Sequence, residues 1–359
     1  MNLKVAFLVA HLCTVFVSAD YGDDALAAIK TLQNKWYNSD TGLWDDLWWQ
    51  SGNMIETIAR FGQHDESFRP TAIQIVSNTY AKSANQKGAQ SWKNEFYDDE
   101  GWWAMGWIAS YDLTGDVKYL NTAKDIFEDM TGGWSTPCNG GIWWDKAQTY
   151  VAAISNELFL SLGAHLANRV KASEKDEYVN WAQMEWDWFQ GTGMINENSL
   201  INDGIRTTDC QNNGRLTWTY NQGVILAGLS EMARAKSDGG FIAKAKTIAN
   251  AAMSKLTVKG ILNEPTTDAL DDTSGHFKGA FVRGLSTLNE NKPRPEVTDF
   301  LRRNADSAWR QNKVDNGVIV DRWQGGSSNA NTATHASGID VLVAAAQTEL
   351  TRSAAMLEL

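Results

Sequence analysis

The chain has 359 residues, of which 43 are acidic and 32 are basic, so its formal net charge is −11 at pH 7. Because phosphate backbones are bound mainly through Lys and Arg, this balance argues against a nucleic-acid partner. An apolar fraction of 43% and only 5 Pro exclude a disordered, linker-rich chain, and 17 Trp are an unusually large number.

The first 19 residues have the pattern of a secretory signal peptide. Lys4 supplies a positive charge, residues 5–17 are largely apolar, and small residues precede a predicted cleavage after Ala19. This apolar run is too short to span a bilayer, and no C-terminal tail of a lipid anchor follows the last helix. We therefore expect a secreted, extracellular protein that is not held in a membrane. As a separate expectation, the protein is a monomer.

Hydrophobic spacing is helical along almost the whole chain. Some segments carry apolar residues on one face only, which is typical of helices in an outer layer. The segment that contains Leu120, Ala123 and Phe127 is an example. Others, such as 102–108 and 223–229, are apolar nearly all round and suit the interior. The pattern predicts twelve helices, at roughly 23–37, 46–62, 66–86, 101–113, 117–130, 149–171, 175–190, 218–236, 240–254, 276–289, 294–312 and 333–350.

Helices that alternate between outer and inner positions form αα-hairpins, and six of them predict an all-α fold, an (α/α)6 barrel. A superhelical repeat array is the alternative, although its repeats usually show a clearer period. Connections from inner to outer helices are short, whereas those from outer to inner helices are long, at 38–45, 87–100, 131–148, 191–217, 255–275 and 313–332. Antiparallel packing places the long loops at one end, which we expect to be the functional end.

A short pattern recurs in these long loops: a Gly, then aliphatic or Trp residues, then acids or amides. It appears at 42–46, 141–145, 193–197, 260–264 and 317–321. The recurrence supports a single domain over residues 20–359 that is built from one duplicated unit.

Aromatic and amide side chains are concentrated in or beside the long loops. Sugars pack their C–H faces on aromatic rings and need donors and acceptors for their hydroxyl groups, so this composition favours a carbohydrate groove. For any single Trp, packing in the core is the more common role. The set that supports the groove is Trp44, Trp48, Trp49, Trp143, Trp144, Trp218 and Trp323.

Asp98 and Asp99 are the strongest catalytic candidates, because they lie where a long loop ends and an inner helix begins. Glycoside hydrolysis uses two carboxyl groups, about 5–5.5 Å apart for retention and roughly 6.5–9.5 Å apart for inversion. Mutual repulsion would keep one carboxyl group protonated, while the helix N-terminus would favour the charged form of the other. Helix capping alone explains the acids equally well. Asp45 and Asp46 form a second, fallback pair.

Other chemistries lack their motifs. The sequence contains no phosphate loop, no GxSxG elbow, no dinucleotide fingerprint and no paired zinc histidines, so we expect no cofactor and no metal. Removal of the signal peptide would leave two cysteines, Cys138 and Cys210, in an oxidising compartment, where they predict a disulfide between two loops. Two free buried thiols are the alternative.

Several runs of the sequence resemble glycoside hydrolase family 76, the α-1,6-mannanases. The most specific are Tyr97-Asp98-Asp99-Glu100-Gly101-Trp102-Trp103 and Trp218-Thr219-Tyr220-Asn221-Gln222-Gly223, and the resemblance covers nearly the whole mature chain. It implies an (α/α)6 barrel that cleaves α-1,6-linked mannan or mannooligosaccharides internally with retention of configuration. It further implies that Asp98 is the nucleophile and Asp99 the acid/base; the residues alone do not order the pair.

Further side chains are expected to line the groove of such an enzyme: Gln50, Asn53, Trp143, Trp144, Asn156, Asp203, Tyr220, Asn221 and Lys278. For Asn156, a buried amide that satisfies a loop carbonyl is an equally good interpretation. Two other functions stay open, a cell-wall transglycosidase acting on mannose-containing glycans and a non-catalytic mannan-binding protein. The cell-wall members of the family carry a C-terminal anchor signal, and its absence from this sequence favours a freely secreted hydrolase.

Overall fold

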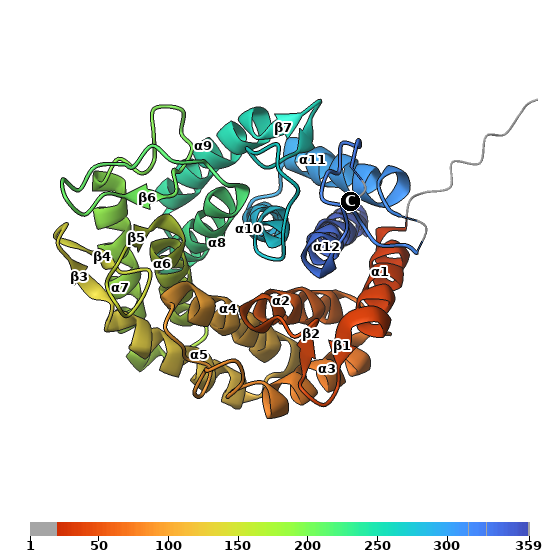
Figure 1. Ribbon diagram of the computed structural model, residues 1–359, viewed down its shortest axis with the longest axis horizontal. Coiled ribbons are helices and arrows are strands. Elements are labelled where there is room, and N and C mark those ends of the chain that lie inside the picture. The colour runs from red at the N-terminus through yellow and green to blue at the C-terminus, as the bar shows by residue number, and fades with distance from the viewer. Residues whose placement is uncertain (1–19, 315, 328, 358–359) are drawn as a thin grey trace, which may run out of the picture.

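Twelve α-helices alternate between an inner and an outer ring in the computed structural model, which describes residues 20–314, 316–327 and 329–357 (Figure 1). The inner helices are α2 (Trp48–His64), α4 (Tyr97–Thr114), α6 (Ala153–Ala167), α8 (Thr219–Lys236), α10 (Phe277–Asn291) and α12 (Thr332–Leu357). The outer helices are α1 (Tyr21–Trp36), α3 (Arg69–Lys82), α5 (Val117–Thr131), α7 (Ala172–Gly191), α9 (Gly239–Lys255) and α11 (Pro295–Asp306). The predicted signal peptide lies outside the described residues.

The ring of inner helices is closed. Each inner helix contacts the next, and α12 returns to contact α2, so the chain forms the predicted barrel rather than an open superhelix. The outer helices pack against this ring, as α1 does on α12 and α5 does on α4. The all-α (α/α)6 prediction is confirmed.

Inner and outer helices differ in how much of their surface is buried, and this difference follows from the pattern of apolar residues. In α4 nearly every residue from Glu100 to Ser110 is buried, because the helix has neighbours on all sides. In α5 the buried residues recur on one stripe that includes Leu120, Ala123 and Phe127, and the opposite face is solvated. The short turn between them begins with Gly115 in a left-handed conformation, and Asp116 caps α5 by accepting from the Lys118 backbone N–H at 3.0 Å.

Two glycines let inner helices α8 and α10 approach backbone to backbone. A Cβ atom at Gly284 would lie 1.9 Å from the carbonyl oxygen of Gly223, and one at Gly223 would lie 2.2 Å from Cα of Phe281. Neither position can hold a side chain unless the helices separate.

The recurring loop pattern forms short β-hairpins, which helical periodicity did not predict. β1 (Tyr37–Asn38) pairs with β2 (Leu43–Trp44), β3 (Trp134–Thr136) with β4 (Gly140–Ile142), and β7 (Thr257–Val258) with β8 (Ile261–Leu262). All five glycines of the pattern have positive φ, between 71° and 80°, and such angles are adopted most readily by Gly: Gly42, Gly141, Gly193, Gly260 and Gly317. The repeat therefore encodes a turn.

Each patterned loop is also held by a polar side chain of a helix that accepts from a backbone N–H of the loop. The acceptors lie on α2, α6, α8, α11 and α12. The pairs, given as acceptor and loop residue, are Ser51 with Trp44, Asn156 with Ile142, Gln222 with Ile201, Asn304 with Leu262, and His335 with Ile319. These bonds satisfy backbone groups that the loops would otherwise bury without partners.

Two of the long loops are joined to each other. β5 (Val151–Ala152) pairs with β6 (Gly204–Ile205), and Cys138 forms a disulfide with Cys210. The bond closes a loop with a sequence separation of 72 residues. It thus ties the segment before α6 to the segment before α8.

We expect the double variant Cys138→Ala, Cys210→Ala to lose roughly 2–4 kcal/mol of unfolding free energy, because the unfolded chain regains the entropy of a long open loop. Urea unfolding of the oxidised protein measures this loss, and peptide mapping without reduction shows the link. A reductant should destabilise the wild type and leave the double variant unchanged. Detection of two free thiols in the purified protein would contradict the prediction.

Within the described part of the chain, no helix is both long and apolar enough to span a bilayer.

Candidate active site

Asp98 and Asp99 lie in the first turn of α4, which begins at Tyr97 and not near residue 101 as predicted. The earlier start has a tertiary cause. The Tyr97 backbone N–H donates to the Trp144 carbonyl at 3.0 Å, and Phe96 forms a β-bridge with Asp145. The loop before α6 therefore supports the N-terminus of α4 and places the Asp98 carboxyl group beside Trp144.

Burial acts on both carboxyl groups of the pair. It raises the pKa of Asp98 to about 6, while a hydrogen bond from the Trp144 side chain and backbone N–H groups oppose the rise. The pKa of Asp99 is raised well above its usual value by burial and then by the charge of Asp98, and a hydrogen bond from Asn94 opposes the rise. Asn94 Nδ2 donates to Asp99 Oδ2 at 2.8 Å. Because the charge of Asp98 raises the pKa of Asp99, the two protons of the pair leave in separate steps.

The next residue of α4, Glu100, anchors this turn from the opposite side. Glu100 is fully buried and accepts from the Asn94 backbone N–H at 2.9 Å and from Lys146 Nζ at 2.6 Å. Lys146 also pairs with Asp129 of α5 at 2.8 Å. The chain of contacts fixes Asn94, which in turn orients Asp99.

A second wall of the site comes from the loop that precedes α8. The Tyr150 hydroxyl donates to Asp203 Oδ2 at 2.7 Å and accepts from Asn213 Nδ2 at 2.7 Å. The Tyr150 ring lies edge-on to Trp144, with centroids 6.5 Å apart. Asp203 is thereby brought to the same end of the barrel as the pair, as predicted, although the sequence analysis did not identify Tyr150.

Tyr220, in the first turn of α8, faces the same cluster. Its ring stacks on Phe277 with centroids 3.9 Å apart and planes 6° apart. Burial raises the pKa of Tyr220 well above its usual value, and the charges of Asp203, Asp98 and Glu157 add to the rise. Asp98 and Tyr220, at the starts of two inner helices, therefore come together with Asp203 of the long loop before α8.

The predicted Trp set divides between the core and the site. Trp44 and Trp323 are 0% exposed, and Trp48 and Trp143 are buried as well. Trp49, Trp144 and Trp218 are half-buried at the long-loop end. Trp49 stacks on Trp102, which follows the acidic pair by one turn, with centroids 6.2 Å apart. These three indoles remain available to contact a sugar.

Two of the predicted groove residues have structural roles. The side-chain amide of Asn156 is 0% exposed and forms three bonds to the backbone of Ile142 and Ala152, at 2.7–3.0 Å. Asn53 is 2% exposed and accepts from Arg283 deep in the barrel. Because both side chains are enclosed, Asn156 has the alternative role that the sequence left open, as a buried amide that anchors a loop. The assignment of Asn53 to the groove is corrected, because it belongs to a buried charged cluster.

Gln50 and Lys278 lie near the long loops but are covered by them. Gln50 Nε2 donates to the Asp272 carbonyl at 3.4 Å. Lys278 Nζ donates to the Asp321 carbonyl and lies 4.1 Å from the Trp323 ring centroid, where burial lowers its pKa to about 7. Asn221 is buried too, and both polar atoms of its amide lack a partner among the described residues.

The fallback pair differs from Asp98 and Asp99. Asp45 and Asp46 are exposed and both have positive φ. Asp45 accepts from the Thr332 hydroxyl at 2.6 Å, and Asp46 pairs with Lys87. Water screens such exposed groups, whereas Asp98 and Asp99 are half-buried.

The sequence profile of Glycosyl hydrolase family 76 matches residues 22–357. Among curated relatives, the mannan endo-1,6-alpha-mannosidase DFG5 of Candida albicans is 23% identical over 350 residues, which are 86% of this chain and 77% of that protein. The mannan endo-1,6-alpha-mannosidase DCW1 of the same organism is 26% identical over 202 residues, 52% of this chain and 44% of its own length. The match thus spans less than half of DCW1.

Solved structures share the fold. The alpha-1,6-mannanase of a Salegentibacter species superposes with a TM-score of 0.79 at 23% identity, covering 91% of this chain and 99% of that one. An inactive variant of that enzyme, in which two consecutive aspartates are replaced by alanine, was solved in complex with alpha-1,6-mannotetrose and superposes with a TM-score of 0.78 at 22% identity, covering 92% and 99%.

Proposed function

The chain belongs to glycosyl hydrolase family 76, and we propose that it hydrolyses α-1,6-mannosidic bonds within mannan, with retention of configuration, through Asp98 and Asp99. The observation that carries this proposal is the environment of the pair. Two adjacent, half-buried aspartates lie at the long-loop end of the barrel, and each carboxyl group receives a different hydrogen bond, from Trp144 and from Asn94.

In the first step, the Asp98 carboxylate attacks the anomeric carbon while Asp99 donates its proton to the glycosidic oxygen, and the bond to that oxygen breaks. In the second step, Asp99 takes a proton from water, which attacks the glycosyl-enzyme and releases Asp98. The higher pKa of Asp99 supports its role as the acid. Consecutive Cα atoms lie about 3.8 Å apart, which suits the short carboxyl separation of a retaining enzyme.

The relatives support the substrate. Curated relatives are named mannan endo-1,6-alpha-mannosidases, and the Salegentibacter enzyme that binds alpha-1,6-mannotetrose is inactive when two consecutive aspartates are replaced. In this chain the aspartate pairs at 45–46 and 271–272 are exposed and the pair at 23–24 lies in outer helix α1, whereas Asp98 and Asp99 are held in an inner helix. Secretion, cleavage after Ala19 and a monomeric state belong to the same proposal.

Incubation of the protein with α-1,6-mannooligosaccharides, followed by NMR of the first products, tests the proposal. We expect internal cleavage and an α-configured reducing end before mutarotation. A β-configured first product would refute retention, and no sugar release would favour a mannan-binding protein. Addition of a mannoside acceptor separates hydrolysis from transglycosylation, because transfer forms longer products at the expense of free reducing ends.

The pH dependence of kcat/KM should be bell-shaped, with its acid limb near pH 6. Activity requires Asp98 to be ionised and Asp99 to be protonated, so it rises as pH passes the Asp98 pKa of about 6 and falls as Asp99 loses its proton at higher pH. Trp144→Phe removes a hydrogen bond to the Asp98 carboxylate and should move the acid limb to higher pH. An acid limb near pH 4, or one that Trp144→Phe leaves in place, would contradict the assignment.

A further inference from the structure

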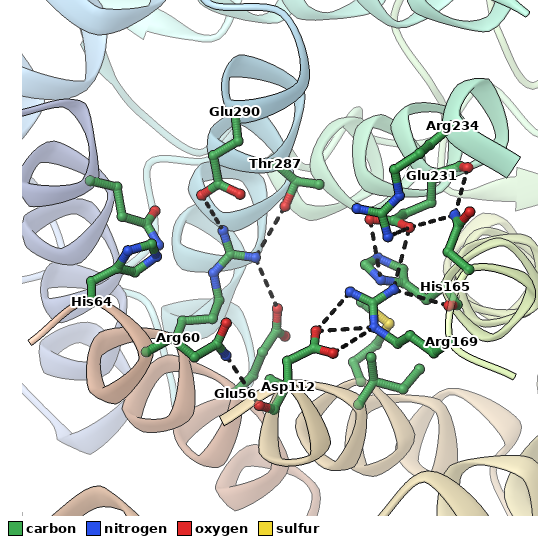
Figure 2. Close-up of a pocket in the computed structure, with 16 residues that line it drawn as sticks. Glu56, Arg60, His64, Asp112, His165, Arg169, Glu231, Arg234, Thr287 and Glu290 are labelled. Atoms are coloured by element: carbon green, nitrogen blue, oxygen red, sulfur yellow. Dashed lines mark hydrogen bonds and ion pairs between the residues drawn. The ribbon is translucent and has the colours of Figure 1, made fainter. Parts of the chain in front are cut away.

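A cavity of about 420 Å³ lies at the short-loop end of the barrel (Figure 2). All six inner helices contribute to its wall through residues near their C-terminal ends. Asp112 in this wall follows Asp98 by 14 positions on α4, which places it about 21 Å farther along the helix axis. The cavity is therefore separate from the candidate active site.

Arginine–carboxylate pairs cross one half of the cavity. Arg169 binds Asp112 through Nε at 2.8 Å and through a terminal nitrogen at 2.7 Å, and it reaches Glu231 at 3.3 Å. Arg234 binds the same Glu231 carboxylate at 2.8 Å. Figure 2 shows these groups converging from α4, α6 and α8. The pairs hold planar donors and acceptors in fixed directions.

The other half of the cavity is built in the same way. Arg60 of α2 donates to the Thr287 hydroxyl at 3.0 Å and to Glu290 at 3.3 Å, both on α10, and lies 3.9 Å from Glu56. Glu56 in turn pairs with Arg283 at 2.9 Å. The charges of this wall are thus balanced before any ligand enters.

His165 points into the cavity between these two halves. It is 6% exposed, and neither ring nitrogen has a hydrogen-bond partner among the described residues. The Glu231 Oε1 atom lies 3.8 Å from Nδ1. Burial, followed by the charge of Arg169, holds the pKa of His165 well below its usual value. The ring is therefore neutral and offers one donor and one acceptor.

A buried polar group without a partner is unfavourable, so the water or ligand that fills the cavity must bond to His165. An anion is unfavourable there, because the guanidinium groups are already paired with carboxylates and the negative ends of the inner helices point toward the cavity. A metal cation is unfavourable because these carboxylates are already paired with arginines. An apolar ligand would leave the wall unsatisfied.

A hydroxyl group both donates and accepts, so a ligand with many hydroxyl groups satisfies His165 and the paired charges together. The volume of about 420 Å³ also falls within the roughly 300–1,000 Å³ of small-molecule sites. We propose that this cavity is a second carbohydrate site, which binds one or two hexose units of a neutral sugar at the end of the barrel opposite Asp98 and Asp99. The proposal does not require that pair to be catalytic.

Imidazole NMR signals test the proposal, because each end of the barrel has its own buried histidine. His165 reports on the cavity, and His276, which packs 5.8 Å from the Trp49 ring, reports on the long-loop end. The protein is the Asp98→Asn, Asp99→Asn variant, which keeps the sugar intact, and the probes are mannose and α-1,6-mannobiose. We expect a saturable shift of the His165 signals that inorganic phosphate does not produce.

Two further variants locate the binding. Ala109→Phe fills the cavity from α4 and should abolish the shift at His165 while any shift at His276 persists. His165→Leu removes the two unpaired nitrogens, so it should keep or raise the melting temperature and weaken mannose binding in calorimetry. A shift confined to His276, a response to phosphate alone, or unchanged mannose binding in His165→Leu would overturn the proposal. Loss of wild-type hydrolysis bears only on the proposed function.

Discussion

Asp98→Asn and Asp99→Asn are each expected to lower kcat for α-1,6-mannan hydrolysis by roughly 10³-fold. The first change removes the nucleophile, so no glycosyl-enzyme forms. The second removes the proton that the leaving oxygen needs and the base that activates water. Both replacements keep the size of the side chain, so binding of α-1,6-mannooligosaccharides should persist. Initial rates and calorimetric affinities, measured on the same preparations, separate the two effects.

The roles within the pair can be ordered with azide. In an Asp99→Ala variant, azide should attack the glycosyl-enzyme and give a product of retained configuration. In an Asp98→Ala variant, azide should take the place of the nucleophile and give the inverted product. Asp46→Asn is the matched control, because Asp46 is an exposed aspartate at the same end of the barrel. Near-normal hydrolysis by either Asp98→Asn or Asp99→Asn would refute the dyad.

Arg283→Met is expected to lower the free energy of unfolding by about 3–5 kcal/mol at pH 8, because it leaves the buried Asp340 carboxylate without its partner and leaves Glu56 with only Arg60, 3.9 Å away. Arg283 pairs with Asp340 at 2.6 Å and with Glu56 at 2.9 Å, and all three side chains are nearly inaccessible to solvent. The same arginine donates to Asn53. Urea unfolding at pH 8 measures the loss.

The loss should be smaller at pH 5. Burial raises the pKa of Asp340 to about 6 in the folded protein, and the charge of Arg283 opposes that rise. A carboxyl group whose folded pKa is raised destabilises the fold progressively as pH rises from its unfolded pKa of about 4 through the folded value. Without Arg283 the folded pKa rises further, so the cost grows toward pH 8.

Asp340→Asn in the Arg283→Met background removes one of the stranded charges and should restore part of the stability at pH 8. Equal losses at pH 5 and pH 8, or no recovery in the double variant, would show that lost packing and not stranded charge explains the effect of Arg283→Met.

The helices were predictable because the spacing of apolar residues that indicates a helix is a local property of the sequence. In α5 the spacing of Leu120, Ala123 and Phe127 assigns both the helix and its buried face from a few consecutive turns. The helix starts at the long-loop end were less predictable. α6 begins at Ala153 and not near 149, because Val151 and Ala152 pair with Ile205 and Gly204, about fifty positions away.

The adjacency of Asp98 and Asp99, the all-round apolar character of α4 and the turn-forming glycines such as Gly42 and Gly141 are covalent or local properties, and the sequence by itself determined them. Which polar groups are free to act was decided only by tertiary structure. The sequence suggested sugar contact for both Asn156 and Trp144. In the fold, three hydrogen bonds to the backbone occupy the Asn156 amide, whereas the Trp144 side chain donates to Asp98. The availability of a polar atom depends on partners that folding brings close, and residue spacing does not record them.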